Sequence, residues 1–178
     1  MKKQELLSLI QKDNERILAL IAVRSLKLPQ CYIAAGFVRN LVWDHLHEKS
    51  TPSNDIDVIF FDAEDTTNQK AQWAQQMLSF RYPSVKWQVK NQALMHDRNG
   101  DKPYSNCIDA MAHWPEKETA VAVTLNEDNK LELLNAFELN SLFEGLISHN
   151  PNRDLSVFLE RISKKRWLEI WPKLQVVH

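Results

Sequence analysis

Hydrophobic residues recur along this chain with two different spacings, and together they predict helices that alternate with strands. Near the N-terminus the apolar residues fall on one side of a helix, which predicts a single helix over residues 3–23. Further along, short apolar runs bounded by Gly, Pro or polar clusters are typical of strands. Strands are expected at 31–35, 55–61, 86–91, 120–125 and 130–135, and helices at 37–47, 64–80, 105–114, 140–146 and after Pro151.

The order of these elements indicates how the chain is organised. Strands alternate with helices, no internal repeat is present, and no linker is long enough to separate two units. We therefore expect one domain over residues 1–178, of the α/β or α+β class. Asn126–Asn129 has the composition of a hairpin turn, and the segment from about 136 to 178 is expected to be helical.

Composition narrows the class of protein further. The 178 residues are 44% hydrophobic and 25% charged with only 3 Gly and 7 Pro, which excludes a disordered or collagen-like chain. The 22 basic and 23 acidic residues give a net charge of -1, so general binding to DNA or to a membrane surface is not expected. A local basic groove stays compatible with these numbers.

Signals for export or membrane insertion are missing from the sequence. Polar residues interrupt the start of the chain, and no apolar run approaches the roughly 18 residues that span a membrane. Cys31 and Cys107 form no CxxC pair and cannot make a zinc site alone. We expect a reduced, cytoplasmic protein.

Asp55-Ile56-Asp57 is the tripeptide with the most chemical content. Alternate residues of a strand point to the same face, so the two carboxylates project together. Carboxylates held side by side repel each other, and a divalent cation such as Mg²⁺ relieves that repulsion. The alternative is that Asp55 is a strand-entry or turn residue and that Asp57 is an edge charge.

A glycine stands some twenty residues upstream, where the strand at 31–35 passes into a helix. Gly36 there allows a ligand to approach the backbone closely, and the free N–H groups of a helix N-terminus attract phosphate. Arg39, one turn into the helix, would add a fork of donors. The alternatives are a tight turn for Gly36 and a structural or solvated charge for Arg39.

Two stretches together resemble the nucleotidyltransferase superfamily of DNA polymerase beta and the tRNA CCA-adding enzymes. Its signature is a GG or GS turn that opens a helix, followed by an Asp-x-Asp strand, and the stretches are 34–40 and 54–58. The whole chain further resembles a bacterial family of nucleotidyltransferase-like proteins. The stretches that support this wider similarity are 87–96, 109–110, 114–116, 119–123 and 167–172.

The resemblance implies a polymerase beta-type fold and a two-metal transfer of a nucleoside monophosphate from an NTP to a hydroxyl. Asp55 and Asp57 would be the catalytic carboxylates that bind Mg²⁺ or Mn²⁺. Gly36 and its neighbouring N–H groups would hold phosphates, and Arg39 would bind phosphate or anchor the helix. Lys90 either faces the triphosphate or is a surface lysine. The acceptor is unknown and can be a small molecule, an RNA or a protein.

The chain departs from the superfamily signature at two positions. Ala35 replaces the first glycine of the turn. The superfamily usually supplies a third carboxylate from a later strand, and the equivalent position here is near Gln88, an amide. Asp109 or Glu132 could substitute from another element. The second hypothesis is therefore a catalytically inactive module that keeps the fold and binds a nucleotide or a protein.

The six tryptophans are interpreted mainly as packing residues. Trp114 or Trp87 is the best candidate for one that stacks on a nucleobase instead.

Overall fold

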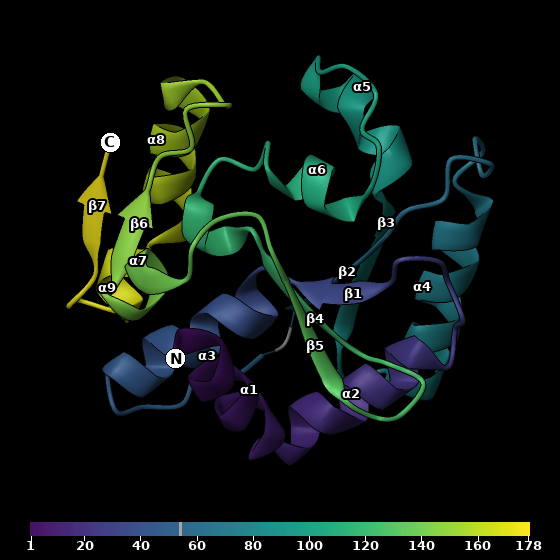
Figure 1. The fold of residues 1–178 in the computed structure, drawn as a ribbon, viewed down its shortest axis with the longest axis horizontal. Coiled ribbons are helices and arrows are strands. Elements are labelled where there is room, and N and C mark those ends of the chain that lie inside the picture. The colour runs from purple at the N-terminus through teal and green to yellow at the C-terminus, as the bar shows by residue number, and fades with distance from the viewer. Residues whose placement is uncertain (54) are drawn as a thin grey trace.

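In a computed structural model that describes residues 1–53 and 55–178, a five-stranded mixed sheet lies at the centre of the fold (Figure 1). Asn54, part of the expected loop and of the motif, lies outside the described residues. The strand order is β3-β2-β1-β4-β5. The strands are β1 (Tyr32–Ala34), β2 (Asp55–Phe60), β3 (Lys86–Asn91), β4 (Val121–Leu125) and β5 (Leu131–Asn135). Each expected strand is confirmed to within one residue at its ends.

The strand directions bring two distant parts of the sequence to one edge of the sheet. β1 runs antiparallel to β2, and Ala34 at the end of β1 pairs with Asp57 near the start of β2. The turn that follows β1 therefore lies beside the acidic start of β2. β2 and β3 run parallel, which requires a crossover, and α4 (Gln69–Arg81) supplies it.

The two faces of the sheet have different cores because side chains alternate along each strand. Ile56, Val58 and Phe60 of β2 belong to the larger core. That core also contains buried residues of four helices, α1 (Lys2–Gln11), α2 (Asn14–Arg24), α3 (Gly36–Leu46) and α4. Asp55, Asp57 and Ile59 project from the opposite face. There Ile59 packs in a smaller core with residues of α6 (Cys107–Met111).

The prediction of one helix over residues 3–23 is wrong, because two helices occupy this region. They are α1 (Lys2–Gln11) and α2 (Asn14–Arg24). Asp13 lies between them with extended backbone, and its carboxylate accepts a hydrogen bond from the backbone N–H of Arg16 at 3.0 Å. An aspartate in this position is a preferred N-cap, so it begins a new helix rather than continuing the first.

The prediction that 136–178 is helical is also wrong in part. The segment contains α7 (Asn140–Phe143), α8 (Leu155–Lys165) and α9 (Trp167–Ile170), but also β6 (Leu146–Ser148) and β7 (Gln175–Val177). The two strands pair in parallel to form a second, small sheet. Gly145, at φ +73°, separates α7 from β6 in the stretch where one helix over 140–146 is expected.

Smaller differences concern where the helices begin and end. α4 begins at Gln69 rather than at residue 64, because the Asp65 carboxylate accepts the N–H groups of Thr67 and Lys70 and holds a loop. The hairpin between β4 and β5 is confirmed. The remaining elements are α3 (Gly36–Leu46), η1 (Gln92–Leu94), α5 (Met95–Asn99) and η2 (Lys117–Thr119).

The mixed sheet flanked by helices confirms the α+β fold class. Among the residues that the structure describes, no helix is both long and apolar enough to span a membrane.

Candidate active site

The two aspartates of the motif lie at the start of β2, on the face of the sheet opposite the larger core. The Asp55 side chain is 61% exposed and that of Asp57 is 38% exposed. Asp57 lines a cavity of about 370 Å³, together with Ala35 from the turn after β1. The antiparallel register of β1 and β2 therefore places the glycine turn and the acidic pair together, as the motif predicts.

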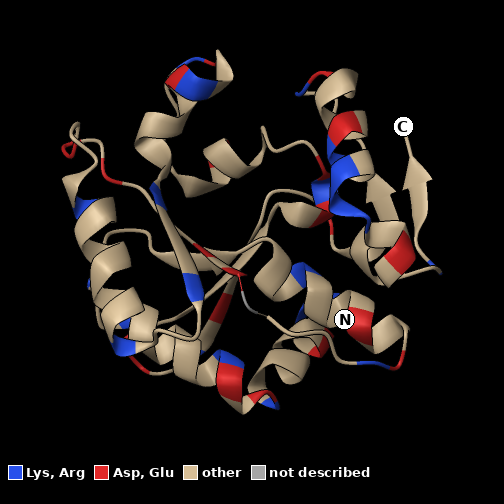
Figure 2. Cartoon of the chain, turned by 180° about the vertical axis from the view of Figure 1, so that it is seen from behind, with Lys and Arg blue, Asp and Glu red and all other residues tan. Residues whose placement is uncertain are grey.

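Each aspartate has a lysine of β3 as its neighbour. Lys86 Nζ lies 3.7 Å from Asp55 Oδ1, and Lys90 Nζ lies 3.8 Å from Asp57 Oδ1. In Figure 2 the acidic start of β2 lies near the middle of the molecule, beside basic residues of β3. The two cations offset the repulsion between the carboxylates, so the pair can exist without a metal.

Gln88 of β3 pairs with Asp57 of β2, in line with the expected position of the superfamily's third carboxylate near Gln88. The Gln88 side-chain oxygen accepts a hydrogen bond from Lys90 Nζ at 3.3 Å. Asp109 is engaged elsewhere, since its carboxylate accepts the Ser105 N–H at 2.8 Å, and Glu132 accepts from Asn126 on the distant β5 hairpin. Neither carboxylate is among the described residues that line the cavity.

The donor set decides which kind of metal site is compatible with this arrangement. Within 1–53 and 55–178, no group of three or more His, Cys, Asp or Glu side chains is placed to hold a metal ion. Asp55 and Asp57 nonetheless share one face and are accessible. They fit an ion such as Mg²⁺, which takes one or two carboxylates and completes its shell with phosphate oxygens and water.

The turn between β1 and α3 has an unusual backbone. Ala35 adopts φ 57° and ψ -121°, in a region that favours glycine, and its N–H donates to the Val121 carbonyl at 2.9 Å. This explains physically why the superfamily signature has glycine there. Gly36 follows as the first residue of α3. The N–H groups of Val38 and Arg39 donate to the Ala35 carbonyl, and those of Gly36 and Phe37 lie before the first of these bonds.

Arg39 is buried, with 5% of its surface exposed, and its guanidinium contacts two neighbouring indoles. Its Cζ is 4.5 Å from the Trp43 ring centre and 4.4 Å from that of Trp167, and Nη1 donates to Thr119 Oγ1 at 2.6 Å. Burial lowers the pKa of Arg39 to about 10. These contacts correspond to the helix-anchoring alternative, and Arg39 is not among the described residues lining the cavity.

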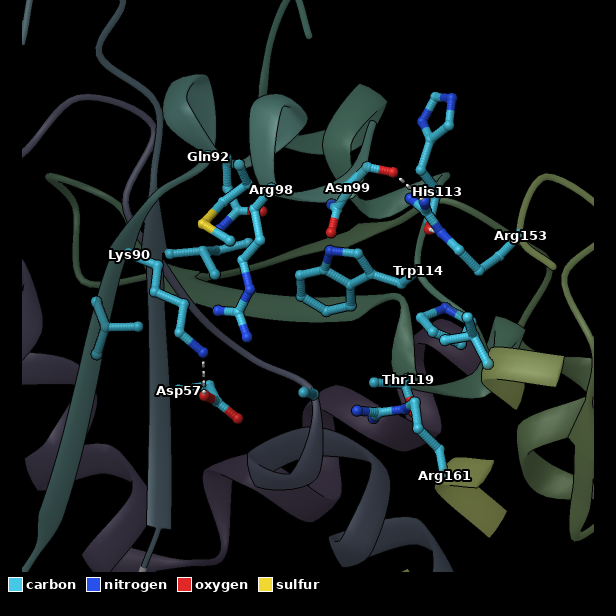
Figure 3. A pocket seen from close by; sticks show the side chains of 16 residues that line it. Asp57, Lys90, Gln92, Arg98, Asn99, His113, Trp114, Thr119, Arg153 and Arg161 are labelled. Atoms are coloured by element: carbon cyan, nitrogen blue, oxygen red, sulfur yellow. Dashed lines mark hydrogen bonds and ion pairs between the residues drawn. The ribbon is translucent and has the colours of Figure 1, made fainter. Parts of the chain in front are cut away.

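The far side of the cavity is basic, a feature that the sequence reasoning missed. Arg98 comes from α5, Arg161 from α8 and Arg153 from the loop before α8 (Figure 3). Arg161 donates from Nε to Oε1 of Glu116 at 2.5 Å, and Glu116 is fully buried. No motif marks these arginines, because only the packing of α5 and α8 around the sheet brings them together.

Arg153 is held by Asp101, which accepts from its Nη2 at 2.6 Å, while its Nε donates to the His113 carbonyl. Burial alone would raise the pKa of Asp101, but hydrogen bonds from Tyr104 and Arg153 outweigh it and hold that pKa below the ordinary value.

Comparison with known proteins agrees with this geometry. A sequence profile described as Nucleotidyltransferase matches residues 21–176. The chain belongs to this nucleotidyltransferase family. The match confirms the superfamily resemblance carried by the glycine turn and the Asp-x-Asp strand. No curated protein sequence matches the chain significantly.

Solved structures show the same fold in relatives. An NMR structure that reveals a CCA-adding enzyme head domain is 32% identical, with a TM-score of 0.86 and coverage of 97% of this chain and 94% of that one. A CCA-adding enzyme with CTP is 17% identical, with a TM-score of 0.60 over 97% of this chain. A tRNA nucleotidyltransferase with primer tRNA and an ATP analog is 18% identical, with a TM-score of 0.50 over 83% of this chain. The chain spans 42% and 43% of those two longer proteins.

Proposed function

We propose that this protein is a metal-dependent nucleotidyltransferase that moves a nucleoside monophosphate from an NTP to a hydroxyl acceptor. One observation carries the proposal. The register of Ala34 with Asp57 brings the turn before α3 beside two accessible carboxylates, of which Asp57 lines a cavity whose far wall is basic. A helix N-terminus and basic side chains attract a triphosphate, and the carboxylates attract the divalent ion that accompanies it.

The proposed roles follow from where each side chain lies. Asp55 and Asp57 would hold Mg²⁺ or Mn²⁺, which supplies charge neutralisation to the phosphates when bound. Gly36 and the N–H groups after it would receive phosphate oxygens, and Lys90 would add a point charge. Arg39 would act indirectly, because its contacts with Trp43 and Trp167 hold α3 in place.

The bond changes balance without a further reactant. The acceptor oxygen forms a bond to the α-phosphorus while the bond from that phosphorus to the bridging oxygen breaks. Pyrophosphate leaves, and the hydroxyl proton passes to water. RNA is the first acceptor to test, because one structural relative holds a primer tRNA.

Calorimetric titration of each NTP with Mg²⁺ tests the nucleotide site. The wild type is compared with the Asp55→Asn/Asp57→Asn double variant, and Asp128→Asn at the exposed hairpin is the matched control. We expect metal-dependent binding in the wild type and in the control, and loss of it in the double variant. Metal-dependent transfer of labelled nucleotide that survives the double substitution would show the site assignment to be wrong.

The inactive binding module stays a second candidate because an amide, Gln88, lies beside Asp57. Incubation of the protein with an [α-³²P]-labelled NTP, Mg²⁺ and total RNA separates the two functions. Radiolabelled RNA that depends on Asp57 excludes the inactive module. Nucleotide binding without any labelled product, over RNA, protein and small-molecule acceptors, favours it.

A further inference from the structure

One tryptophan differs from the others in where its indole lies. Trp43, Trp87, Trp167 and Trp171 are buried in the larger core. Trp73 is 48% exposed on α4. Of the tryptophans in the described part of the chain, Trp114 alone lines the cavity that contains Asp57. The structure therefore separates the two candidates for a stacking residue, because Trp87 is packed in the core.

Hydrogen bonds fix the backbone of Trp114. The Trp114 N–H donates to the Met111 carbonyl at 3.0 Å, and the Trp114 carbonyl accepts from Asn150 Nδ2 at 2.7 Å. Asn150 is fully buried. An indole on a fixed backbone offers a flat surface at a low cost in conformational entropy, which suits stacking.

Polar groups surround the indole on the cavity side. Figure 3 shows Arg98 and Asn99 of α5 above Trp114, with the Arg98 guanidinium between Lys90 and the indole in this view. Asn99 Nδ2 donates to the Tyr104 hydroxyl at 3.2 Å, and the Asn99 carbonyl accepts from Arg153 Nη1 at 3.3 Å. These bonds hold α5 over the cavity, so Asn99 is a fixed polar group beside a flat apolar one.

We propose that Trp114 is the platform on which the base of the incoming nucleotide stacks, with Asn99 at the edge of that base. The inference rests on the proposed function, because it assigns the other end of a nucleotide whose phosphates lie toward Asp57 and Lys90. An aromatic surface joined by cationic side chains to a metal-binding pair suits a ligand with a flat ring and a polyanionic tail. The cavity of about 370 Å³ has the size of a small-molecule site.

The test compares two kinds of ligand, both with Mg²⁺. The first is each of the four NTPs, and the second is inorganic tripolyphosphate, which lacks the nucleoside. Calorimetry measures both on the wild type, on Trp114→Leu and on the control Trp73→Leu. Base stacking contributes about 1–3 kcal/mol, so Trp114→Leu is expected to weaken NTP binding about 5- to 150-fold. Binding of tripolyphosphate is expected to stay unchanged, and Trp73→Leu is expected to alter neither.

A second variant covers the case in which Trp114→Leu fails to fold. Trp114→Phe keeps an aromatic ring, and we expect a smaller loss of NTP affinity with tripolyphosphate binding unchanged. The Trp114 indole N–H resonance, assigned as the one missing from Trp114→Phe, is expected to shift with NTP and not with tripolyphosphate. The stacking role of Trp114 would be wrong if NTP leaves the indole resonance unshifted, or if the variants lose equal affinity for NTP and for tripolyphosphate.

The outcomes also separate this inference from the proposed function. If NTP and tripolyphosphate bind the wild type equally, the nucleoside contributes nothing and the platform is wrong, while the phosphate site stands. If neither probe binds folded wild-type protein at millimolar concentration, both proposals fail together.

Discussion

Two arginines near the cavity, Arg39 and Arg161, have opposite surroundings. Arg39 contacts the indoles of Trp43 and Trp167 and donates to a neutral hydroxyl. Arg161 is paired with the fully buried carboxylate of Glu116 and lines the cavity. The first connects elements of the core, whereas the second exposes part of an ion-paired guanidinium to the cavity.

The difference shows that proximity to a motif is a poor guide to the role of an arginine. Arg39 follows the glycine turn directly in the sequence, yet its guanidinium donates to Thr119 and Asn40 and contacts two indoles. Arg161 lies far from either motif in the sequence, yet it reaches the cavity that Asp57 lines. Removal of each side chain therefore has a different expected consequence.

The largest effect is expected at Arg161. Arg161→Leu leaves the buried Glu116 carboxylate without its partner, which costs about 3–5 kcal/mol of unfolding free energy. Replacing both members, Glu116→Leu with Arg161→Leu, is expected to recover most of that loss, because no buried charge is left unpaired. Chemical denaturation of the three variants measures this, and equal loss in the single and double variants would refute the pairing argument.

A smaller loss of unfolding free energy is expected when Arg39 is replaced, because its hydrogen bonds go to the neutral side chains of Thr119 and Asn40. Arg39→Leu should cost about 2–3 kcal/mol, because it removes two cation–π contacts and the hydrogen bonds to Thr119 and Asn40 but also the cost of burying a guanidinium. Arg39→Lys keeps the charge but not the planar stack, so we expect it to recover little of the loss. Denaturation curves check both variants, and full recovery by lysine would mean that charge alone matters at this position.

In the turn before Arg39, a substitution is expected to raise stability rather than lower it. Ala35 adopts a backbone conformation that favours glycine, which costs an alanine about 1–3 kcal/mol. Ala35→Gly removes that strain but adds backbone entropy to the unfolded chain, so a net gain of about 1 kcal/mol is expected. The midpoint of thermal unfolding measures it; a lower midpoint would indicate that the turn is not strained.

The smallest effect on stability is expected at Asp101, the ion-pair partner of Arg153. The pKa of Asp101 is lowered in the folded state. The folded carboxyl binds its proton less readily than the unfolded one, so it stabilises the fold above the ordinary value of 3.8. That contribution decreases as the pH falls below 3.8 toward the lower pKa of the folded state. The stability difference between wild type and Asp101→Asn should therefore shrink from pH 6 to pH 3. A constant difference would exclude this linkage.

The central sheet and the acidic motif could be predicted because each depends on neighbours in the sequence. Asp55 and Asp57 share a face through the two-residue period of a strand, and apolar runs mark the strands themselves. The superfamily resemblance also indicated a position near Gln88 on a later strand, and the register of β2 with β3 pairs Gln88 with Asp57. The break between α1 and α2 could have been predicted, since Asp13 is a good N-cap. The apolar stripe on both sides of Asp13 instead suggested one continuous helix.

By itself, the sequence determined the order of the strands along the chain, the acidic pair and the family to which the protein belongs. Only the tertiary structure decided that β6 pairs with β7, that Arg39 contacts two indoles, and that Arg98, Arg161 and Trp114 share a cavity with Asp57. The physical reason is range. Side-chain alternation and turn chemistry act over a few residues, whereas a cavity wall depends on how helices pack across the sheet.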